Sequence, residues 1–303
     1  MRSLDAAQVR RSLHWPALIE AMRAALIAFS QGAARQPLRT VTELPNGGCL
    51  FTMPAWLPHP PALGAKLVSI CPSNATLGIE THQATLVMLH PSTGQTAAIL
   101  EATGLTAMRT AAVSALSVEA LARLDAQHLA ILGTGAQARS HLDAFRHIRL
   151  WQSIRAWSPS PQRLAQFAAT HNIEAASSPE HAVRNAGVIL LATSSPTPVI
   201  DEAWVQPGAH VISIGAPRPT EREIDPALLH RATIVVDSRV SALAESGDIR
   251  LTPNIAIHAE LGEVLARTAP GRATRAEITI FKSLGLAVED VAAGALVLHS
   301  LSS

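Results

Sequence analysis

Lysine is almost missing from this chain. Lysine and arginine together number 24 among 303 residues, yet Lys66 and Lys282 are the only lysines, and tyrosine is absent. Charged residues make up 16% of the chain and hydrophobic residues 48%, a composition that excludes a disordered chain and indicates a large buried core. Because 23 acidic residues balance the basic ones, the net charge of +1 argues against nucleic-acid binding driven by positive charge.

Cysteines and long apolar runs are scarce as well. Cys49 and Cys71 form no recognisable disulfide framework, and two thiols in a chain of this size favour a reducing compartment. The longest apolar runs, such as residues 186–193, are far shorter than the ~20 residues of a membrane span. We therefore expect a cytoplasmic protein with no membrane segment and no metal site.

The first part of the chain predicts helices followed by short strands. Pro16 opens a run of apolar residues with helical spacing, and Pro45-Asn46-Gly47 is typical of a β-hairpin turn. The expected strands are residues 38–44, 48–53, 65–70, 84–89 and 96–100. A helix over about 105–124 leads into a different pattern.

From residue 126 onward, short apolar strands alternate with helices. Strands are expected over residues 128–132, 153–157, 188–192, 210–214 and 233–236, with a helix over 137–146 and further helices between the later strands. Such runs, rich in valine, isoleucine and leucine, are typical of a parallel sheet covered on both faces. The predicted fold class is α/β, with a doubly wound sheet.

A glycine-rich turn joins the first of these strands to its helix. Gly133 permits a tight turn, Gly135 lets a pyrophosphate approach the backbone, and Ala138 allows the helix to pack closely on the sheet. The start of the helix supplies N–H groups for phosphate. The pattern predicts a dinucleotide site, against the alternative of a purely structural turn, with these residues: Gly133, Thr134, Gly135, Ala136, Gln137 and Ala138.

The second strand bears on which dinucleotide binds. An enzyme that uses NAD carries an acidic residue about 20 residues after the glycines, whereas Ser158, Ser160 and Arg163 occupy this region here. NADPH is therefore the preferred cofactor, and NADH is the alternative if the serines only form a turn and cap the next helix. Ligands lie outside the carboxyl ends of such strands, so four further residues are expected at the cofactor: Thr193, Ser194, Ser213 and Ile214.

Ten segments of the chain, in order, resemble one enzyme family. They are RTV at 39–41, MPAW at 53–56, KLVS at 66–69, THQA at 81–84, TAMRTAA at 106–112, GTGAQA at 133–138, PGAH at 207–210, DSR at 237–239, ESGD at 245–248 and FKSLG at 281–285. Over essentially its whole length the chain resembles the ornithine cyclodeaminase/mu-crystallin family. It is most similar to the ketimine reductase, or Δ1-pyrroline-2-carboxylate reductase, type.

The resemblance implies an NAD(P)-dependent enzyme acting on small amino acids or cyclic imino acids. It implies a Rossmann-type dinucleotide-binding domain over residues 113–284. A second, α+β domain for substrate binding and dimerisation would cover residues 1–112, joined by a C-terminal helix over 285–303. A homodimer is expected.

The resemblance also implies site residues. Counterparts of Arg39, Lys66 and Arg109 bind the substrate carboxylate and its surroundings, with Lys66 and Arg109 catalytic and Arg109 also near the cofactor. Thr81 and His82 lie where the chain passes close to the cofactor. Ser283 matches a position near the substrate, and its alternative role is a helix cap.

The chemistry of the cations agrees with these roles. Arginine grips a carboxylate with two parallel hydrogen bonds, and lysine supplies a point charge. Lys66 lies in an otherwise apolar strand, where an unpaired ammonium is costly, so its alternative is a structural ion pair. Arg109 lies mid-helix between small residues and needs a partner, whereas the alternative for Arg39 is a solvated charge on a hairpin strand.

For two further residues the sequence also allows a role outside catalysis. His82 has a suitable intrinsic pKa for a general acid, but a hydrogen-bonded core histidine is the competing interpretation. Lys282 has no chemical role that the sequence indicates, and a surface charge is expected there.

One departure from the family distinguishes between its reactions. The resemblance implies an aspartate at position 217 in ornithine cyclodeaminases, but this chain has Pro217, which carries no carboxylate and no N–H. We therefore predict reduction of Δ1-pyrroline-2-carboxylate, and of Δ1-piperideine-2-carboxylate, to L-proline and L-pipecolate. The alternatives are an ornithine cyclodeaminase, an alanine-type amino-acid dehydrogenase and a non-catalytic, mu-crystallin-like binding protein.

Overall fold

The computed structural model describes residues 1–45, 47–216 and 218–301. The chain forms two compact units, unit 1 of residues 1–112 with 285–303 and unit 2 of residues 113–284. Helix α3 (Thr103–Leu121) contributes its first part to unit 1 and its second part to unit 2. None of the helices in the described part of the chain combines the length and hydropathy needed to cross a bilayer.

Unit 1 contains a six-stranded sheet with the order β1-β6-β5-β4-β3-β2. Strands β2 to β6 pair antiparallel, and the short β1 pairs parallel with β6. The strands are β1 (Arg2–Leu4), β2 (Thr40–Glu43), β3 (Cys49–Leu57), β4 (Ala62–Ile70), β5 (His82–Leu89) and β6 (Thr96–Glu101). The helices are α1 (Ala6–Ser12), α2 (Trp15–Ser30), the 3-10 helix η1 (Pro72–Leu77) and α11 (Ala287–Ser300).

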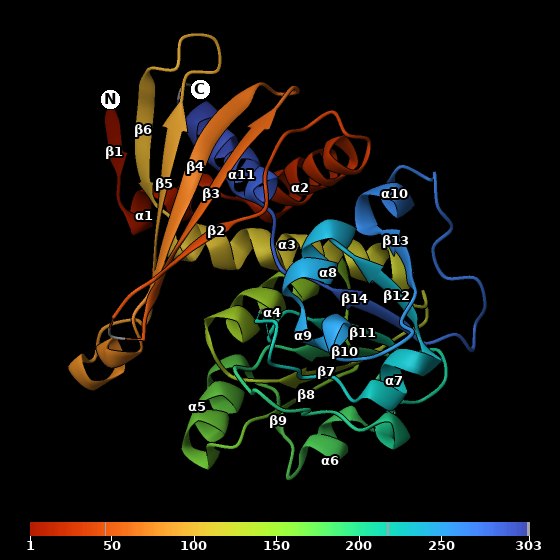
Figure 1. The fold of residues 1–303 in the computed structure, drawn as a ribbon. Helices are drawn as coiled ribbons and strands as arrows, with labels where there is room; N and C mark the ends of the chain where they lie inside the picture. Colours follow the sequence, from red (N-terminus) through yellow and green to blue (C-terminus); the bar gives the residue numbers. More distant parts are fainter. Residues whose placement is uncertain (46, 217, 302–303) are drawn as a thin grey trace. The chain divides into compact units, whose positions relative to one another are not determined.

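Helix α11, from the end of the chain, packs on the sheet of unit 1. It contacts β3, β4 and β5 and lies beside α2 (Figure 1). The cross-strand register places Met53, Lys66, Leu86 and Leu100 in one row on one face of the sheet. Since side chains alternate between faces along a strand, this row lies on the face that α11 covers.

Unit 2 is a doubly wound α/β domain. All eight strands run parallel in the order β13-β12-β14-β11-β10-β7-β8-β9. They are β7 (His128–Leu132), β8 (Ser153–Trp157), β9 (Glu174–Ala175), β10 (Val188–Leu191), β11 (His210–Ser213), β12 (Thr233–Val236), β13 (Ile257–Glu260) and β14 (Thr279–Lys282). The chain order reverses at β7, which pairs with both β8 and β10, and this switch point is where such folds bind ligands.

Helices connect these parallel strands. They are α4 (Ala136–Ile148), α5 (Pro161–His171), α6 (Pro179–Val183), α7 (Pro226–Arg231), α8 (Arg239–Glu245), α9 (Gly247–Arg250) and α10 (Leu261–Leu265), with the 3-10 helix η2 (Glu202–Trp204). Helices α5, α6 and α7 carry proline in their first turn, where its missing N–H has no helical acceptor to lose.

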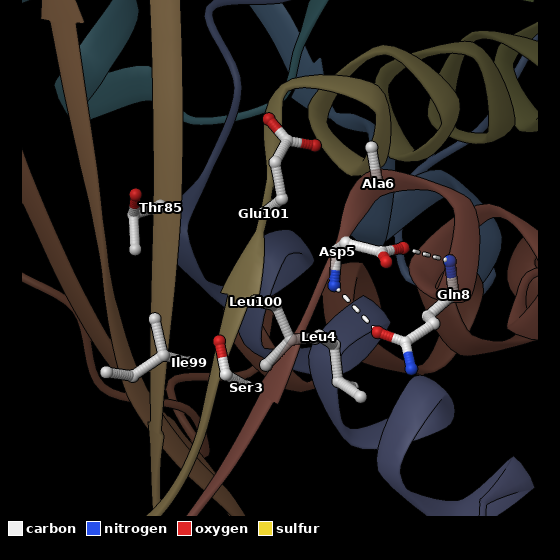
Figure 2. Close-up of a pocket in the computed structure, with 9 residues that line it drawn as sticks. All are labelled: Ser3, Leu4, Asp5, Ala6, Gln8, Thr85, Ile99, Leu100 and Glu101. Atoms are coloured by element: carbon white, nitrogen blue, oxygen red, sulfur yellow. Dashed lines mark hydrogen bonds between the residues drawn. The ribbon is translucent and has the colours of Figure 1, made fainter.

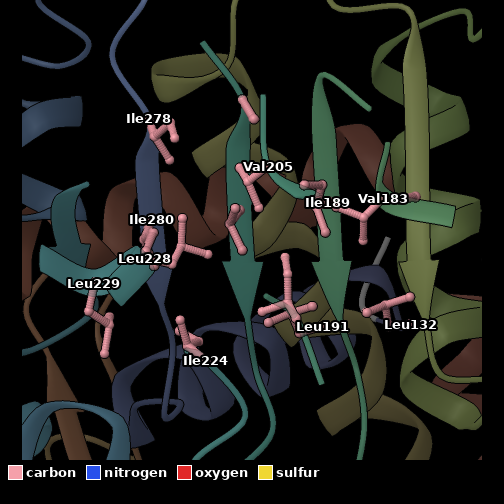
Figure 3. Packing of buried hydrophobic residues seen from close by; sticks show 14 of the residues in the cluster. Leu132, Val183, Ile189, Leu191, Val205, Ile224, Leu228, Leu229, Ile278 and Ile280 are labelled. Carbon is pink, nitrogen blue, oxygen red and sulfur yellow. The ribbon is translucent and has the colours of Figure 1, made fainter. Parts of the chain in front are cut away.

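The core of unit 2 lies against the central strands (Figure 3). Every residue of β10 is buried, because helices cover both faces of a parallel sheet. Leu132, Ile189 and Ile280 from the strands pack in one apolar cluster with Val183 of α6 and Leu228 of α7. This cluster fixes the sheet whose carboxyl edge carries the glycine turn.

The predicted α/β fold class is confirmed, and most element boundaries lie close to the prediction. The hairpin of β2 and β3 is present, although Asn46 in its turn lies outside the described residues. Strands β3 and β4 are longer than predicted because they pair continuously from Cys49–Ile70 to Leu57–Ala62. The prediction missed β1, β9, β13 and β14, which have two to four residues each and too little apolar pattern to be distinctive.

A buried polar chain joins α3 to the sheet of unit 2. His210 is fully buried, with Nε2 3.1 Å from Ser117 Oγ and Nδ1 2.9 Å from Thr279 Oγ1. Burial, with the charge of Arg272 adding to it, lowers the pKa of His210 to about 3. The folded protein therefore keeps this imidazole neutral at pH values where the unfolded chain protonates it.

We expect His210 to make the fold sensitive to acid. Between pH 6.5 and about 3 the unfolded state binds a proton at His210 that the folded state does not, so stability is lost as pH falls through this range. The slope from this one group approaches about 1.4 kcal/mol per pH unit. Denaturant unfolding from pH 7 to 4 should show a shallower decline for His210→Asn than for the wild type. Equal slopes would contradict the assignment.

Candidate functional site

The glycine turn of unit 2 has the geometry that the sequence predicts. Gly133 has a φ of 119°, and a Cβ there would lie 2.2 Å from the carbonyl oxygen of Ala192. A Cβ on Gly135, the N-cap of α4, would instead meet no atom within 4 Å. Ala138 is fully buried. Gly133 and Ala138 therefore serve packing, and Gly135 leaves open space at the start of a helix.

The first turn of α4 has N–H groups that no side chain caps. Gly135 is the N-cap and contributes no side-chain hydrogen bond. Thr134 precedes it, and Ala136 and Gln137 begin the helix, so all of the predicted turn residues lie together. Uncapped N–H groups and the helix dipole suit an anion such as a phosphate.

The serines after β8 have structural roles. Ser160 caps α5 by accepting from the N–H of Arg163 at 3.4 Å, and Ser158 Oγ accepts from the N–H of Ser160 at 3.4 Å. Arg163 is exposed. Both hydroxyls accept in these bonds, so the bonds do not use the hydroxyl protons.

The residues after β10 and at the end of β11 are held by a carboxylate that the sequence analysis missed. Thr193 Oγ1 donates to Glu223 Oε2 at 3.1 Å, and Ser213 Oγ donates to Glu223 Oε1 at 2.7 Å. Burial raises the pKa of Glu223 to about 6, against the lowering effect of Lys282. Of the other two predicted residues, Ser194 is exposed and Ile214 is half-buried.

The expectation of a surface charge at Lys282 is wrong. Its side chain is fully buried at the end of β14, and Nζ lies 2.8 Å from Asp248 Oδ2. Nζ also donates to Ser213 Oγ at 2.9 Å and to the carbonyl of Gly215. Lys282 is the last residue of a short apolar strand. Its acceptors come from distant parts of the chain, and they offset the cost of burying the ammonium.

Unit 1 brings two of the predicted cations together. Lys66 Nζ donates to Asp290 Oδ1 at 2.8 Å, and Arg109 Nε donates to the same oxygen at 2.9 Å. Arg109 Nη1 donates to Glu289 Oε2 at 2.7 Å. All four side chains are buried. The ion pair that was the alternative for Lys66 is therefore present, and Arg109 has the partner its burial required.

Gly285 connects Arg39 to this cluster. Arg39 Nη2 donates to the Gly285 carbonyl at 3.2 Å, and Arg39 lies just before β2. A Cβ on Gly285, whose φ is 81°, would lie 2.6 Å from Arg109 Nη1. The backbone of Gly285 thus packs directly against the guanidinium. Arg39 contacts the residue that leads toward α11, whereas Lys66 and Arg109 contact carboxylates of its first turn.

Burial changes the acidity of Lys66. Desolvation lowers its pKa to about 8, the charge of Asp290 opposes this, and the charge of Arg109 adds to it. The ammonium is therefore mostly protonated at pH 7. Asp290 occupies at most two of its three N–H groups, which leaves donor capacity for a ligand.

Two predicted residues of unit 1, His82 and Thr81, lie away from the cation cluster. His82 pairs with Ile70 on β4, four residues along the strand from Lys66, a separation of about 13 Å at the usual rise of a strand. Thr81 Oγ1 lies 3.0 Å from His82 Nδ1. In unit 2, Ser283 Oγ donates to Asp237 Oδ2 at 3.1 Å. Pro217 lies outside the described residues.

Two recesses in the units are not lined by the predicted site residues. In unit 1 a recess of about 440 Å³ is lined by Asp5, Gln8, Thr85 and Glu101, among others (Figure 2). The dashed lines in Figure 2 show Asp5 and Gln8 bonding each other's backbone N–H as the capping box of α1. In unit 2 a recess of about 340 Å³ lies beside Trp157 and Trp204.

The acidic residues of both clusters escaped the sequence analysis. Glu289 and Asp290 form a pair inside a segment that is otherwise almost wholly apolar, and this pairing was a readable signal. Glu223 and Asp248 lie in loop-rich stretches with no comparable pattern. The side-chain carboxylates of Glu223 and Asp248 have partners 8 to 34 positions away, so sequence spacing could not reveal them.

The parallel sheet, its switch point and its glycine turn define unit 2 as a Rossmann-type fold, accompanied in unit 1 by an α+β domain with a buried cation cluster. Residues 2–303 match the family described as the ornithine cyclodeaminase/mu-crystallin family. The chain belongs to this family.

Relatives and solved structures are similar over nearly the whole chain. Ketimine reductase mu-crystallin of Mus musculus is 39% identical over 292 residues, 94% of this chain and 92% of the relative. The Δ1-pyrroline-2-carboxylate reductase of Thermococcus litoralis, in complex with NADH and L-proline, has a TM-score of 0.95 at 32% identity, covering 100% of this chain and 98% of that one. An archaeal alanine dehydrogenase dimer with bound NAD has a TM-score of 0.94 at 31% identity, covering 100% and 96%.

The two glycines of the turn should respond differently to alanine. Gly133→Ala places a methyl group against the Ala192 carbonyl at a φ that alanine avoids, so we expect a fall in stability of several kcal/mol. Gly135→Ala fills open space and should change stability by less than about 1 kcal/mol. Denaturant unfolding of the two variants checks this. Similar losses for both would contradict the geometry described for the turn.

Proposed function

We propose that this protein reduces small cyclic ketimines with a reduced nicotinamide dinucleotide. The substrates are Δ1-pyrroline-2-carboxylate and Δ1-piperideine-2-carboxylate, and the products are L-proline and L-pipecolate. The observation that carries the proposal is the buried pair of Lys66 and Arg109, oriented by Asp290, in a chain that also has a dinucleotide-type glycine turn. The similarity to a reductase that binds NADH and L-proline supports it.

The glycine turn fits the pyrophosphate of the cofactor. Gly135 leaves space where any side chain would project, and the uncapped N–H groups of α4 lie next to it. When bound, NAD(P)H supplies the hydride. We assign cofactor binding to unit 2, residues 113–284, and substrate binding to unit 1, residues 1–112 with 285–303.

The cation cluster binds the carboxylate of the imine. Lys66 supplies a point charge, and Arg109 supplies N–H groups in a fixed plane, with Asp290 and Glu289 holding both in place. Arg39 adds a third cation beside Gly285. Anchoring the carboxylate orients the ring, and such positioning supplies much of the rate of a reaction that needs only one hydride and one proton.

The proton on the imine nitrogen comes with the substrate, from water or from His82 in this mechanism. Reduction adds hydride to the carbon of a protonated C=N bond, so the nitrogen of the product already carries its proton. His82 remains the predicted proton donor among the side chains, paired with Thr81 at 3.0 Å. Ser283, predicted near the substrate, donates to Asp237 and fixes the turn after β14.

We propose a preference for NADPH over NADH. No acidic residue lies between β8 and Arg163, where an NAD-specific enzyme holds the ribose. Arg163 is exposed, and its backbone N–H donates to Ser160 Oγ. A 2′-phosphate would accept from Ser158, Ser160 and Arg163. The ratio of kcat/KM for NADPH over NADH should exceed one. The two cysteines of the sequence form no recognisable disulfide framework, which favours a cytoplasmic location.

We further propose that the protein is a homodimer. The face of the six-stranded sheet opposite Lys66 carries apolar side chains, among them Trp56, Leu63, Leu67 and Val87. Trp56 is 37% exposed and Leu67 38%, and exposed apolar side chains gathered on one face are typical of an interface. In a two-fold dimer the same surface of both subunits forms the interface, so this face would pack against the same face of a second copy.

A substrate panel tests the proposed function. Purified protein with either imine and NADPH or NADH should consume the reduced nicotinamide, measured by its absorbance. L-Ornithine with NAD(P)⁺ should release no ammonia, and pyruvate with ammonia should react far more slowly than the imines. Absence of turnover with both imines would overturn the proposal.

Lys66 should control imine binding and its pH dependence. In Lys66→Met, kcat/KM for the imine should fall about 10- to 100-fold, since a charge-assisted hydrogen bond contributes about 1.5–3 kcal/mol. The affinity for NADPH should stay within about twofold. In the wild type, the Kd of pyrrole-2-carboxylate, a planar carboxylate without a basic nitrogen, should rise above pH 8 as Lys66 loses its proton. A flat profile from pH 7 to 9.5 would remove Lys66 from the anion site.

The dimer should separate when its apolar face gains a charge. Leu67→Arg would bury two like charges near the two-fold axis, so we expect the dissociation constant to rise at least about 100-fold. Leu150→Arg is the control, because Leu150 is 92% exposed in unit 2. Sedimentation equilibrium measures both. A Leu67→Arg variant that remains dimeric would exclude this face as the interface.

A further inference from the structure

Lys282 has no part in the proposed reaction, yet it lies at the centre of a buried ionic cluster in unit 2. Lys282, Asp248, Glu223 and Ser213 are all fully buried. Nζ of Lys282 lies 2.8 Å from Asp248 Oδ2 and donates to Ser213 Oγ at 2.9 Å. Burying three charges together is costly. Lys282 and Asp248 form an ion pair, and Glu223 is stabilised by hydrogen bonds from neutral donors.

Glu223 joins the ends of two neighbouring strands. Its Oε1 accepts from Ser213 Oγ and from the N–H of Gly215, both at 2.7 Å, and its Oε2 accepts from Thr193 Oγ1 at 3.1 Å. Thr193 follows β10, and Ser213 ends β11. A single carboxylate therefore fixes the backbone at the carboxyl ends of two adjacent strands.

Lys282 and Asp248 hold Glu223 in this place. Asp248 Oδ1 accepts from the backbone N–H groups of Glu223 at 2.9 Å and Ile224 at 3.0 Å, which fixes the segment that carries the Glu223 side chain. Lys282 bonds Ser213 and the carbonyl of Gly215, the same residues that donate to Glu223. Lys282, Asp248 and Glu223 therefore all form hydrogen bonds with backbone groups between Gly215 and Ile224.

The contact between Glu223 and Gly215 admits no side chain. A Cβ on Gly215 would lie 2.3 Å from Glu223 Oε2 and 2.3 Å from the carbonyl oxygen of Thr193. The carboxylate therefore packs directly on the backbone of the loop after β11. Ser194 and Ile214 are neighbours of the braced residues, and Ser194 is exposed while Ile214 is half-buried.

We propose that Glu223, held by Lys282 and Asp248, is a positioning residue for the dinucleotide. It fixes the ends of β10 and β11 so that Ser194 and Ile214 form a rigid surface for the nicotinamide half of the cofactor. Ligands of open α/β sheets bind outside the carboxyl ends of the strands, next to the switch point, and β10 is the strand beside it. The identity of the ligand rests on the proposed function. Thr193 and Ser213 then brace the site rather than touch the cofactor.

Glu223→Gln tests this role. Glutamine keeps the shape and one acceptor oxygen but loses the charge and the second acceptor. A loosened surface must be ordered on binding, so we expect the Kd for NADH, from fluorescence titration, to rise about tenfold. The KM for the imine at saturating NADH should stay within about twofold. If Glu223 only stabilised the fold, its replacement would not raise the Kd for NADH while leaving the KM for the imine unchanged.

Glu277→Gln is the matched control. Glu277 accepts from the hydroxyl of Thr233 and from the backbone N–H groups of Ala273 and Thr274, so its bonds resemble those of Glu223. It precedes β14, and Thr233 begins β12, so this carboxylate lies at the opposite, amino edge of the sheet. Glu277→Gln should lower the melting temperature without changing the Kd for NADH.

The outcomes separate the inference from the proposed function. Wild-type protein that binds neither NADH nor NADPH overturns both. Binding that Glu223→Gln leaves within twofold, or that Glu277→Gln weakens as much, overturns the inference alone. If Glu223→Gln does not fold, Asp248→Asn makes the same comparison, because it keeps an acceptor for the two backbone N–H groups and removes only the charge facing Lys282. A tenfold rise in Kd then supports the inference, and an unchanged Kd overturns it.

Discussion

A charge inside an apolar interior must have a partner, and this requirement governs both lysines of the chain. Lys66 and Arg109 share Asp290 in unit 1, while Lys282 pairs with Asp248 in unit 2. Removing one member of such a pair leaves an uncompensated buried charge, which typically destabilises by 3–5 kcal/mol. Each pair therefore fixes the elements that carry it: α11 against β4 in one unit, and the loops at the carboxyl edge of the sheet in the other.

The two clusters differ in what their carboxylates do. In unit 1 the carboxylates of α11 orient cations whose remaining N–H groups suit the carboxylate of a substrate. In unit 2 the carboxylate of Glu223 accepts from hydroxyl and backbone N–H groups and thereby shapes a surface. In the proposed function, the cluster of unit 1 provides charge for a ligand, and the cluster of unit 2 provides rigidity.

Local patterns in the sequence were enough for much of the architecture. Apolar runs such as His128–Leu132 and Val188–Leu191 predict the central parallel strands because both of their faces are buried. The order of strand, glycine turn and helix predicts the phosphate-type turn, since Gly133 and Gly135 act within a few residues of each other. Short strands such as β14 escaped because four residues ending in a lysine do not form a distinctive pattern.

By itself the sequence determined the fold class, the glycine turn and the identity of the candidate cations, because each depends on residues close together in the chain or on segments that resemble one family. Only the tertiary structure decided the partners of those cations. Asp290 lies 224 residues from Lys66 and 181 from Arg109, and the Lys282 cluster joins residues as far apart as 213 and 282. Such pairings depend on how distant elements pack, so Lys282, which looked like a surface charge, proved to be fully buried.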